Sequence, residues 1–202
     1  MKPITLDGFE GKFSGDADPW RTFSDRDEAV KRDAILHAIG AGPIGRVLEL
    51  GAGNGSNSVA IAARALRLDA TEATASGTRL TARAIAPCDS RARAIQLAVP
   101  ARLPRPDYDV AVVAEILYYL DARAMARAAR DVAGALRPGG RLVLAHHRVD
   151  YPDFAQHAAF IHARFLRDSG CRWRVRVVRR TGRWLVTACT LLPSRNMAAI
   201  LP

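Results

Sequence analysis

The stretch that decides the fold is Val47-Leu48-Glu49-Leu50-Gly51-Ala52-Gly53-Asn54-Gly55. The apolar run 46–50 predicts a buried strand, the glycines predict a tight turn, and residues 56–68 have the composition of a helix. A strand, a glycine turn and a helix in this order are the context in which a glycine-rich loop binds a cofactor. Gly51, Gly53 and Gly55 carry no side chain, so a ligand can lie against the backbone there. The N–H groups at the helix start favour an anionic group of that ligand.

The spacing of the glycines narrows the kind of cofactor. A dinucleotide-binding loop has the pattern Gly-x-Gly-x-x-Gly, whereas this loop reads Glu-x-Gly-x-Gly-x-Gly and has Ser56 in the place of the third glycine. The loop also lacks the Gly-Lys-Ser/Thr of nucleoside-triphosphate sites, which are therefore excluded. A plain strand-to-helix turn stays open as the alternative, and the elements downstream decide between the two.

Length and charge bound the class of protein. The chain has 202 residues, of which 49% are hydrophobic, and this predicts one globular domain with a small N-terminal cap. A chain of this length buries about 70% of its unfolded surface. The net charge of +10 raises the possibility of nucleic-acid binding, but nearly all the basic residues are arginines scattered along the chain. We therefore predict a small-molecule partner rather than a nucleic acid.

Three further features bear on location. Cys88, Cys171 and Cys189 have neither metal-binding nor redox spacing, and we expect reduced thiols in a cytoplasmic protein. The first 12 residues do not have the pattern of a signal peptide. No apolar run reaches the roughly 18 residues of a membrane span, so no membrane association is predicted. We expect a monomer or a homodimer.

The rest of the chain alternates between predicted strands and helices. Residues 1–24 form an N-terminal cap or lid that contains Asp18-Pro19-Trp20, and a helix follows over 25–39. Further strands are predicted at 66–71, 93–97, 108–114 and 141–145, with helices at 74–86, 121–136 and 153–168. Two final strands, 173–178 and 184–191, form a hairpin before a tail over 193–202.

This order predicts an α/β fold over residues 25–192. We expect a doubly wound, Rossmann-like sheet of seven strands, mostly parallel, with an antiparallel C-terminal hairpin. Cofactors in such sheets lie at the carboxyl ends of the strands. Glu72 ends the second strand, 21 residues after Gly51, which is where nucleotide-binding α/β folds place an acceptor for the ribose hydroxyls. A solvated surface glutamate is the alternative for this residue.

Four features together resemble class I S-adenosylmethionine-dependent methyltransferases. They are the segment from Glu49 to Gly55, Glu72, the turn Arg137-Pro138-Gly139-Gly140, and the terminal hairpin. Two further stretches, Asp18-Pro19-Trp20 and residues 113–120, are similar to the nodulation protein S family. Members of that family are N-methyltransferases that act on partly de-N-acetylated chitooligosaccharides.

The resemblance implies S-adenosylmethionine as the cofactor. It places Gly51 and Gly53 at the methionyl end, Glu49 at the ammonium group and Glu72 at the ribose. The cofactor-binding residues that it implies are Glu49, Gly51, Ala52, Gly53, Gly55, Glu72, Val99, Glu115 and Ile116. No metal site is expected, because His157 and His162 are five residues apart and do not share a helix face.

The acceptor is expected to lie beside the end of the fourth strand. The resemblance implies that Glu115, Ile116, Tyr118 and Tyr119 form the floor between the methyl donor and the acceptor, although core packing is the alternative for both tyrosines. Trp20 is expected either to cover the site or to pack in the core. His146 and Glu115 are the candidate general bases, because they follow strand ends and a base helps to remove the proton of an amine.

One of the histidines is expected to be structural. His146 and His147 are adjacent in a strand, so their side chains point to opposite faces and at most one can face the site. We assign the catalytic group as His146, Glu115 and Tyr118, and the substrate-binding group as Trp20, Tyr118, Tyr119 and His146. A hydrogen-bonded structural role remains the alternative for His146.

The chain departs from its class near the adenine. Related methyltransferases commonly have an acid after the third strand that accepts from the adenine amino group. Aligning their Leu-Pro with Leu103-Pro104 puts Val99 at the acid and Pro100 at the adjacent N–H donor. Valine cannot accept a hydrogen bond and proline has no N–H, although a one-residue slip of the alignment would offer the N–H of Ala101. We therefore expect adenine to be held by stacking between apolar side chains such as Val99 and Ile116.

The sequence thus predicts methyl transfer from S-adenosylmethionine to a small molecule, and the amine of an amino sugar or oligosaccharide is the best single prediction. Methylation of RNA or protein is a second hypothesis, supported only by the charge. The chain lacks the Asn/Asp-Pro-Pro-Tyr sequence of base-amino methyltransferases and has Glu115-Ile116-Leu117-Tyr118 there instead. A non-catalytic binding subunit with the same fold is the third hypothesis.

Overall fold

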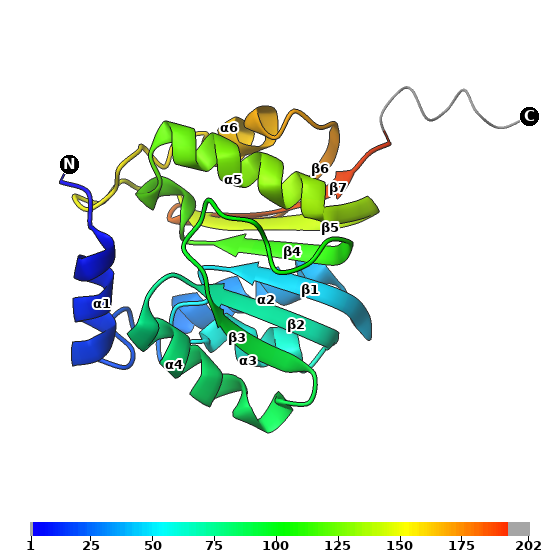
Figure 1. Cartoon of the computed structure of the whole chain (residues 1–202). Helices are drawn as coiled ribbons and strands as arrows, with labels where there is room; N and C mark the ends of the chain where they lie inside the picture. Colours follow the sequence, from blue (N-terminus) through cyan, green and yellow to red (C-terminus); the bar gives the residue numbers. More distant parts are fainter. Residues whose placement is uncertain (1, 194–202) are drawn as a thin grey trace, which may run out of the picture.

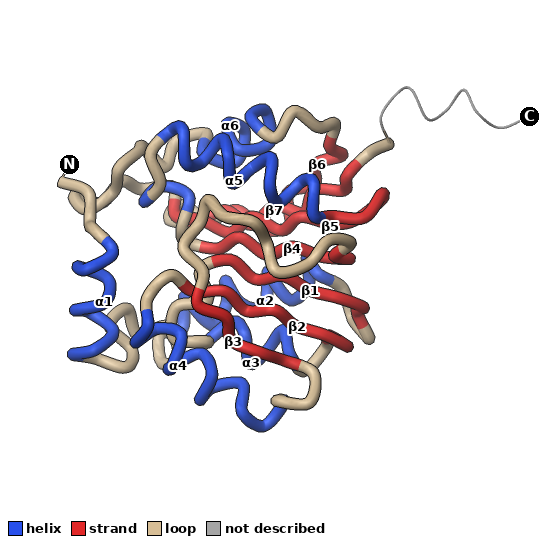
Figure 2. The backbone as a smooth tube through the Cα atoms, in the orientation of Figure 1, coloured by secondary structure: helices blue, strands red, loops and turns tan. Residues whose placement is uncertain are grey.

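The computed structural model describes residues 2–193, so the predicted tail over 193–202 lies almost wholly outside the described residues. A seven-stranded sheet forms the middle layer, and helices cover both of its faces (Figures 1 and 2). The strand order is β3-β2-β1-β4-β5-β7-β6. The strands are β1 Ile44–Leu50, β2 Ala65–Glu72, β3 Ala92–Gln96, β4 Tyr108–Ala114, β5 Leu136–His147, β6 Trp173–Arg180 and β7 Trp184–Leu191.

The direction of the strands confirms the predicted fold. Strands β1 to β5 pair in parallel, whereas β7 pairs antiparallel with both β5 and β6. The doubly wound, mostly parallel sheet with an antiparallel C-terminal hairpin is therefore as predicted. Parallel pairing brings the carboxyl ends of β1, β2 and β4 to one edge of the sheet, where cofactors of such folds bind.

Each face of the sheet has its own hydrophobic core. Val47, Val110 and Val112 point to the face covered by α2 Arg26–Ile39, α3 Ser56–Ala62 and α4 Ala75–Ile85. Leu48 and Val113, one position further along the same strands, point to the face covered by α5 Ala122–Ala135 and α6 Ile161–Asp168. The alternation follows from the two-residue period of a strand, and burial on both faces explains the apolar runs at 47–48 and 110–114.

The helix after the glycine loop is shorter than predicted. We expected it over 56–68, but α3 ends at Ala62 and β2 begins at Ala65. Strand β2 must begin there because Ala65 pairs with Ile44 at the start of β1. Val59 and Leu66 are 40% and 55% exposed, so the apolar spacing that suggested a longer helix does not mark a buried face.

The predicted helix over 153–168 is also wrong in its first half. Only residues 161–168 are helical, and Phe160 before them has a left-handed backbone with φ 58°. The N–H groups of Ala155 and Gln156 donate to the carbonyl of Tyr118, at 2.7 and 3.1 Å, instead of forming helical bonds. This segment therefore follows the short 3-10 turn η2 Leu117–Tyr119 and brings Phe154 against Tyr118.

Strand β5 starts at Leu136, whereas the predicted strand starts at residue 141. The difference arises because the Arg-Pro-Gly-Gly turn lies inside the strand. Leu136 pairs with Tyr108, and pairing then resumes at Arg141, so residues 137–140 bulge out of the ladder. Gly139 within the bulge has φ 75°, a conformation that favours glycine. The turn predicted at 137–140 is thus present as a bulge within a strand.

The N-terminal segment contains a helix that the sequence did not indicate. Helix α1, Leu6–Gly15, begins at the capping side chain of Thr5 and buries Phe13. Its Glu10 accepts hydrogen bonds from the backbone N–H of Ser76, at 3.0 Å, and from the Ser76 hydroxyl, which ties α1 to the start of α4. Figure 1 shows α1 standing across the edge of the sheet to which the carboxyl ends of β1 and β4 point.

Among residues 2–193, no helix is both long enough and apolar enough to cross a lipid bilayer.

Candidate active site

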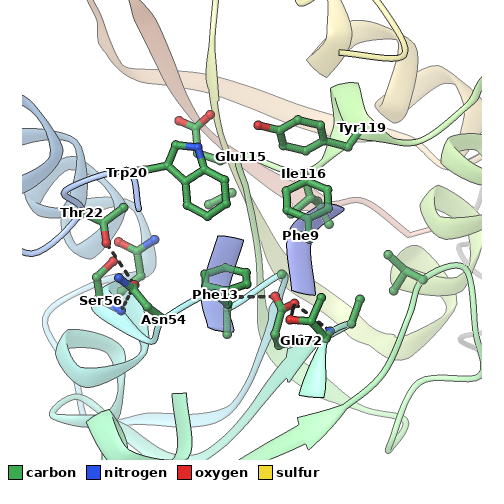
Figure 3. A pocket seen from close by; sticks show the side chains of 18 of the residues that line it. Phe9, Phe13, Trp20, Thr22, Asn54, Ser56, Glu72, Glu115, Ile116 and Tyr119 are labelled. Carbon is green, nitrogen blue, oxygen red and sulfur yellow. Dashed lines mark hydrogen bonds between the residues drawn. The ribbon is translucent and has the colours of Figure 1, made fainter. Parts of the chain in front are cut away.

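A cavity of about 370 Å³ lies between this edge of the sheet and the N-terminal segment. The glycine loop and the ends of β2 and β4 form one side, and α1 with Trp20 forms the other. Figure 3 shows the rings of Phe9, Phe13 and Trp20 with Glu72 and Asn54 on one side and Glu115 and Tyr119 on the other. The cavity therefore joins residues from seven separate parts of the chain, at 4–22, 28–31, 51–57, 72–74, 97–99, 114–120 and 147.

The glycine loop lies against the cavity as predicted, but its glycines have different roles. Gly51 has φ 67°, and a Cβ there would lie 2.1 Å from Cγ2 of Ile116. Gly53 has φ 61°, and both residues line the cavity with Ala52. Gly55 does not line it, because a Cβ at Gly55 would meet Ala84 of α4 at 2.8 Å. The prediction that Gly55 contacts the cofactor is therefore wrong; its missing side chain serves helix packing.

Glu72 lies where the sequence placed it, at the end of β2 and on the cavity. Oε2 accepts from the N–H of Gly53 at 3.1 Å, and Oε1 accepts from the N–H and hydroxyl of Thr74 at 2.9 and 2.8 Å. These bonds fix the carboxylate between the glycine loop and α4. A carboxylate oxygen has two lone-pair directions, so Oε2 keeps one acceptor position for a ligand.

Glu49 lies beneath the glycine loop and does not line the cavity. Its carboxylate accepts from the Ser58 hydroxyl at 2.6 Å. Burial raises the pKa of Glu49 to about 7, the Ser58 bond opposes this shift, and the charge of Glu72 adds to it. The predicted direct contact of Glu49 with the cofactor's ammonium is therefore wrong for this arrangement. The side chain joins β1 to α3 and holds the loop from below.

Glu115 is the centre of the polar contacts at the end of β4. Its carboxylate accepts from Lys31 Nζ at 2.5 Å, from the Tyr118 hydroxyl, and from the backbone N–H of His147 at 3.3 Å. The backbone of Glu115 has φ 57°, which is uncommon for a residue with a side chain. Such strained positions cluster at functional sites, and this one turns the carboxylate toward the cavity that Glu115 lines.

Lys31 is a site residue that the sequence analysis missed. It lies on α2, is 3% exposed, lines the cavity, and bonds Glu28 at 2.7 Å as well as Glu115. Burial lowers the pKa of Lys31, but the charges of Glu115 and Glu28 outweigh burial, so the net direction is upward. Lys31 is therefore a buried ammonium between two carboxylates. The spacing of three residues between Glu28 and Lys31 was the available signal.

The two tyrosines after β4 both reach the cavity. Tyr118 is almost fully buried, and its ring stacks on Phe154 with centroids 3.7 Å apart. The Tyr119 ring meets Phe9 of α1 edge to face at 4.9 Å, and burial raises its pKa, with the charges of Asp153 and Glu115 adding to the shift. Both tyrosines therefore pack against neighbouring rings and also line the cavity.

His146 does not reach the cavity, and this corrects the sequence analysis. Its Nε2 accepts from the N–H of Leu117 at 3.2 Å, and Nδ1 lies 3.1 Å from Nε2 of His162. Burial, the neighbouring His162 and the charge of Lys31 hold the pKa of His146 well below its usual range. Both ring nitrogens are engaged, so His146 can act neither as a base on a substrate nor as a substrate contact. The adjacent His147 lines the cavity instead.

Trp20 lines the cavity, which agrees with the first of its two predicted alternatives, a place over the site. Its ring packs against Phe13 at 5.3 Å and Phe9 at 6.0 Å between centroids. Asp18 fixes the turn before it by accepting from the N–H of Thr22 at 2.7 Å and from the side-chain amide of Asn54 at 2.8 Å. The aromatic cover thus comes from α1 and Trp20 together, and the sequence analysis identified only Trp20.

The part of the cavity that is expected to hold the adenine is apolar, as the alignment predicted. Val99 lines the cavity beside Leu97 and Ala98, and Ile116 faces it from the end of β4. Residues 97–99 contribute no carboxylate. Among residues 2–193, no group of three or more His, Cys, Asp or Glu side chains is arranged to hold a metal ion.

Part of the chain matches a known protein family. Residues 48–142 match the family described as a methyltransferase domain. Just under half of the chain, from Leu48 to Leu142, thus corresponds to a methyltransferase domain. The match begins within β1 and ends within β5, so it spans the glycine loop, Glu72 and Glu115.

Solved structures share the fold. The N-methyltransferase NodS from Bradyrhizobium japonicum WM9, in complex with S-adenosyl-L-homocysteine, has a TM-score of 0.75 and 18% identity and covers 95% of this chain and 100% of its own. An O-methyltransferase family protein from Burkholderia thailandensis has a TM-score of 0.71 and 16% identity, over 95% of this chain and 64% of its own. Phosphoethanolamine N-methyltransferase 1 from Haemonchus contortus has a TM-score of 0.68 and 16% identity, over 95% and 51%. No curated protein matches the chain.

Proposed function

We propose that the protein transfers the methyl group of S-adenosylmethionine to the amine of a small molecule, with an amino sugar or its oligosaccharide as the acceptor. The observation that carries this proposal is the charge of the cavity. Its lining holds the carboxylates of Glu28, Glu72 and Glu115 but only one ammonium, that of Lys31. S-adenosylmethionine carries a net positive charge, as does a protonated amine, and both fit an acidic cavity.

The residues present fit the cofactor. The open backbone at Gly51 and Gly53 would hold the methionyl end, and the remaining acceptor position of Glu72 Oε2 would accept from a ribose hydroxyl. Val99 and Ile116 would pack on the adenine. A Cβ at Gly51 would overlap Cγ2 of Ile116, so the packing of Ile116 and the φ of 67° both require glycine at that position.

The bound cofactor supplies an electrophilic methyl group on a sulfonium. The chain then has to hold a neutral amine in line with that methyl and to exclude water. Glu115 Oε1 accepts a hydrogen bond from Lys31 and lies 3.9 Å from Nε2 of His147, whereas Oε2 accepts from both Tyr118 and the backbone N–H of His147. Oε1 therefore keeps an acceptor position for an N–H of the amine. Positive charge develops on the nitrogen during transfer, and the fixed carboxylate stabilises it. His147 replaces His146 as the histidine placed to receive the released proton.

The N-terminal segment over residues 1–24 would act as the lid of this site. Its aromatic residues Phe9, Phe13 and Trp20 cover the cavity, and Glu10 anchors it to α4. We place the protein in the cytoplasm, because its three cysteines are free thiols.

Product analysis tests the proposed function. The protein is incubated with S-adenosylmethionine and with glucosamine, N-acetylglucosamine or glucosamine 6-phosphate, and the products are examined by mass spectrometry. We expect one methyl group on the nitrogen of glucosamine and none on N-acetylglucosamine, whose amide nitrogen is not nucleophilic. Glu115→Gln should lose most of the turnover. Methylation of N-acetylglucosamine at an oxygen, or of none of the three, would contradict the assignment of an amino-sugar acceptor.

The role of Glu72 can be measured without an acceptor. Hydrogen bonds to charged groups contribute about 1.5–3 kcal/mol, so Glu72→Ala should weaken S-adenosylmethionine binding roughly tenfold or more. Calorimetric titration of the parent and the variant gives the two dissociation constants. Equal affinities, with unchanged circular dichroism, would remove Glu72 from the cofactor site.

A further inference from the structure

A cluster of three charged side chains joins α2 to the end of β4 on the wall of the cavity. Lys31 Nζ lies 2.7 Å from Oε1 of Glu28 and 2.5 Å from Oε1 of Glu115. The two residues of α2 are one helical turn apart, so they share a face of the helix. All three residues line the cavity, and neither Glu28 nor Lys31 belongs to the glycine loop or to the strand ends.

The charges of this cluster do not balance. Two carboxylates face one ammonium, which leaves a formal charge of −1. Among residues 2–193, Oε2 of Glu28 has no hydrogen-bond or ion-pair partner, and the Glu28 side chain is 20% exposed at the cavity. The surplus charge therefore lies on the α2 side of the cavity wall.

We propose that Glu28, Lys31 and Glu115 form a cation-selecting subsite, in which Lys31 positions both carboxylates and Glu28 supplies the surplus negative charge. This inference rests on the proposed function, because the cations concerned are the sulfonium of S-adenosylmethionine and an amine acceptor. The subsite favours the sulfonium cofactor over its neutral product, S-adenosylhomocysteine. It also disfavours acceptors that carry a phosphate or carboxylate beside the reacting group.

The placement of the cluster supports this role. Glu115 immediately precedes Ile116, whose Cγ2 fills the space that a side chain at Gly51 would occupy. The cluster is thus adjacent to the point where the methionyl end of the cofactor passes the end of β4. The only difference in charge between S-adenosylmethionine and S-adenosylhomocysteine is at sulfur, so their relative affinity measures the field at that point.

The test compares these two ligands by calorimetric titration of the whole chain at low ionic strength. Glu28→Gln keeps the shape of the side chain and removes its charge. We expect the preference for S-adenosylmethionine over S-adenosylhomocysteine to fall about fivefold in this variant, as for one charge several ångströms away in a partly screened site. Binding of the neutral S-adenosylhomocysteine should change less than twofold.

Two matched variants control the result. Asp33→Asn removes the same charge from an exposed position of α2 that does not line the cavity, and it should leave the preference unchanged. Glu28→Asp keeps the charge and should retain most of the preference. Raising the salt concentration should reduce the parent's preference, because exposed charges are screened, and this measurement needs no variant.

The outcomes separate the two proposals. Failure of both ligands to bind the parent would contradict the proposed function itself. If both ligands bind and Glu28→Gln keeps the parent's preference, the cation-selecting subsite is wrong and the proposed function stands. A fall of the same size in Asp33→Asn would also overturn the inference, because the effect would then come from net charge alone.

Discussion

Replacing Lys31 by methionine should lower the free energy of unfolding by about 3 kcal/mol. The ammonium is 3% exposed and holds two carboxylates that would be left without their partner. Removing one member of a buried ion pair costs about 3–5 kcal/mol because the other charge stays buried. We take the lower end, because the side chains of Glu28 and Glu115 are 20% and 27% exposed and can be partly solvated through the cavity.

Urea denaturation followed by circular dichroism measures the change. Lys12→Met is the matched control. Lys12 is an exposed lysine of α1 whose ammonium lies 5.7 Å from the centre of the Trp20 ring, so its loss should change the free energy of unfolding by no more than about 1 kcal/mol. The double variant Lys31→Met/Glu115→Gln should be more stable than Lys31→Met alone, because one uncompensated charge is gone. Equal losses in Lys31→Met and Lys12→Met would mean that the buried cluster contributes nothing to stability.

The parts of the site that the sequence predicted depend on local patterns. Gly51 and Glu115 each follow a strand with an apolar run, Glu72 is the last residue of β2, and parallel strands end at one edge of the sheet. Placing the strands was therefore enough to bring these residues together. The mostly parallel sheet with its antiparallel hairpin followed from the alternation of elements, and the structure confirms it.

The parts that the sequence did not predict depend on contacts between distant segments. Lys31 and Glu115 are 84 positions apart, and nothing local marks the lysine as buried. Helix α1 has no strong apolar face of its own, and its rings are covered by packing on Trp20 and Tyr119. These contacts depend on the folded edge of the sheet, against which the N-terminal segment packs, so no local sequence pattern predicts them.

The assignment of the histidine failed for a different reason. Alternation along β5 requires that His146 and His147 point to opposite faces, but it does not say which face holds the site. Leu144, two positions before His146, packs with α5 and α6, whereas Ala145 packs on the side of α2. His147 therefore lies on the face where α2 carries Lys31, and the sequence alone had no means to choose it.

The buried histidine pair gives the fold a dependence on pH. His146 Nε2 accepts from Leu117, so its proton is on Nδ1 and is donated to His162, whose own Nδ1 then faces the hydroxyl of Thr187 at 3.1 Å. Both rings are neutral. Burial lowers the pKa of His162 to about 3, and that of His146 is also well below its usual 6.5. Protonating His146 would set an N–H against the N–H of Leu117, where η2 begins.

The direction of the effect follows from these shifts. The unfolded chain takes up protons near pH 6.5 while the folded chain does not, so the stabilisation is complete above about pH 6.5 and is lost as the pH falls toward 3. Between pH 7 and pH 5 this loss is about 2 kcal/mol for His162, and His146 adds a loss in the same direction. Glu49 has the opposite effect, because its pKa is raised to about 7 and the folded chain therefore binds a proton between pH 7 and pH 5. This uptake stabilises the folded chain at pH 5 by about 2 kcal/mol and offsets part of the loss from the histidines.

The contribution of the two histidines to the pH dependence of stability can therefore be measured by comparing the parent with a variant that lacks both. The free energy of unfolding is measured at pH 7 and pH 5 for the parent and for His146→Gln/His162→Gln, which keeps polar side chains but removes both titrating groups. The change between the two pH values should differ between these proteins by about 2 kcal/mol or more, of which His162 contributes about 2 kcal/mol, with the parent losing stability on acidification relative to the variant. His37→Gln, at an exposed position of α2, is the control and should follow the parent. If the double variant also follows the parent, the two rings do not stay neutral in the folded protein, and the floor carrying Tyr118 and Tyr119 is held by other contacts.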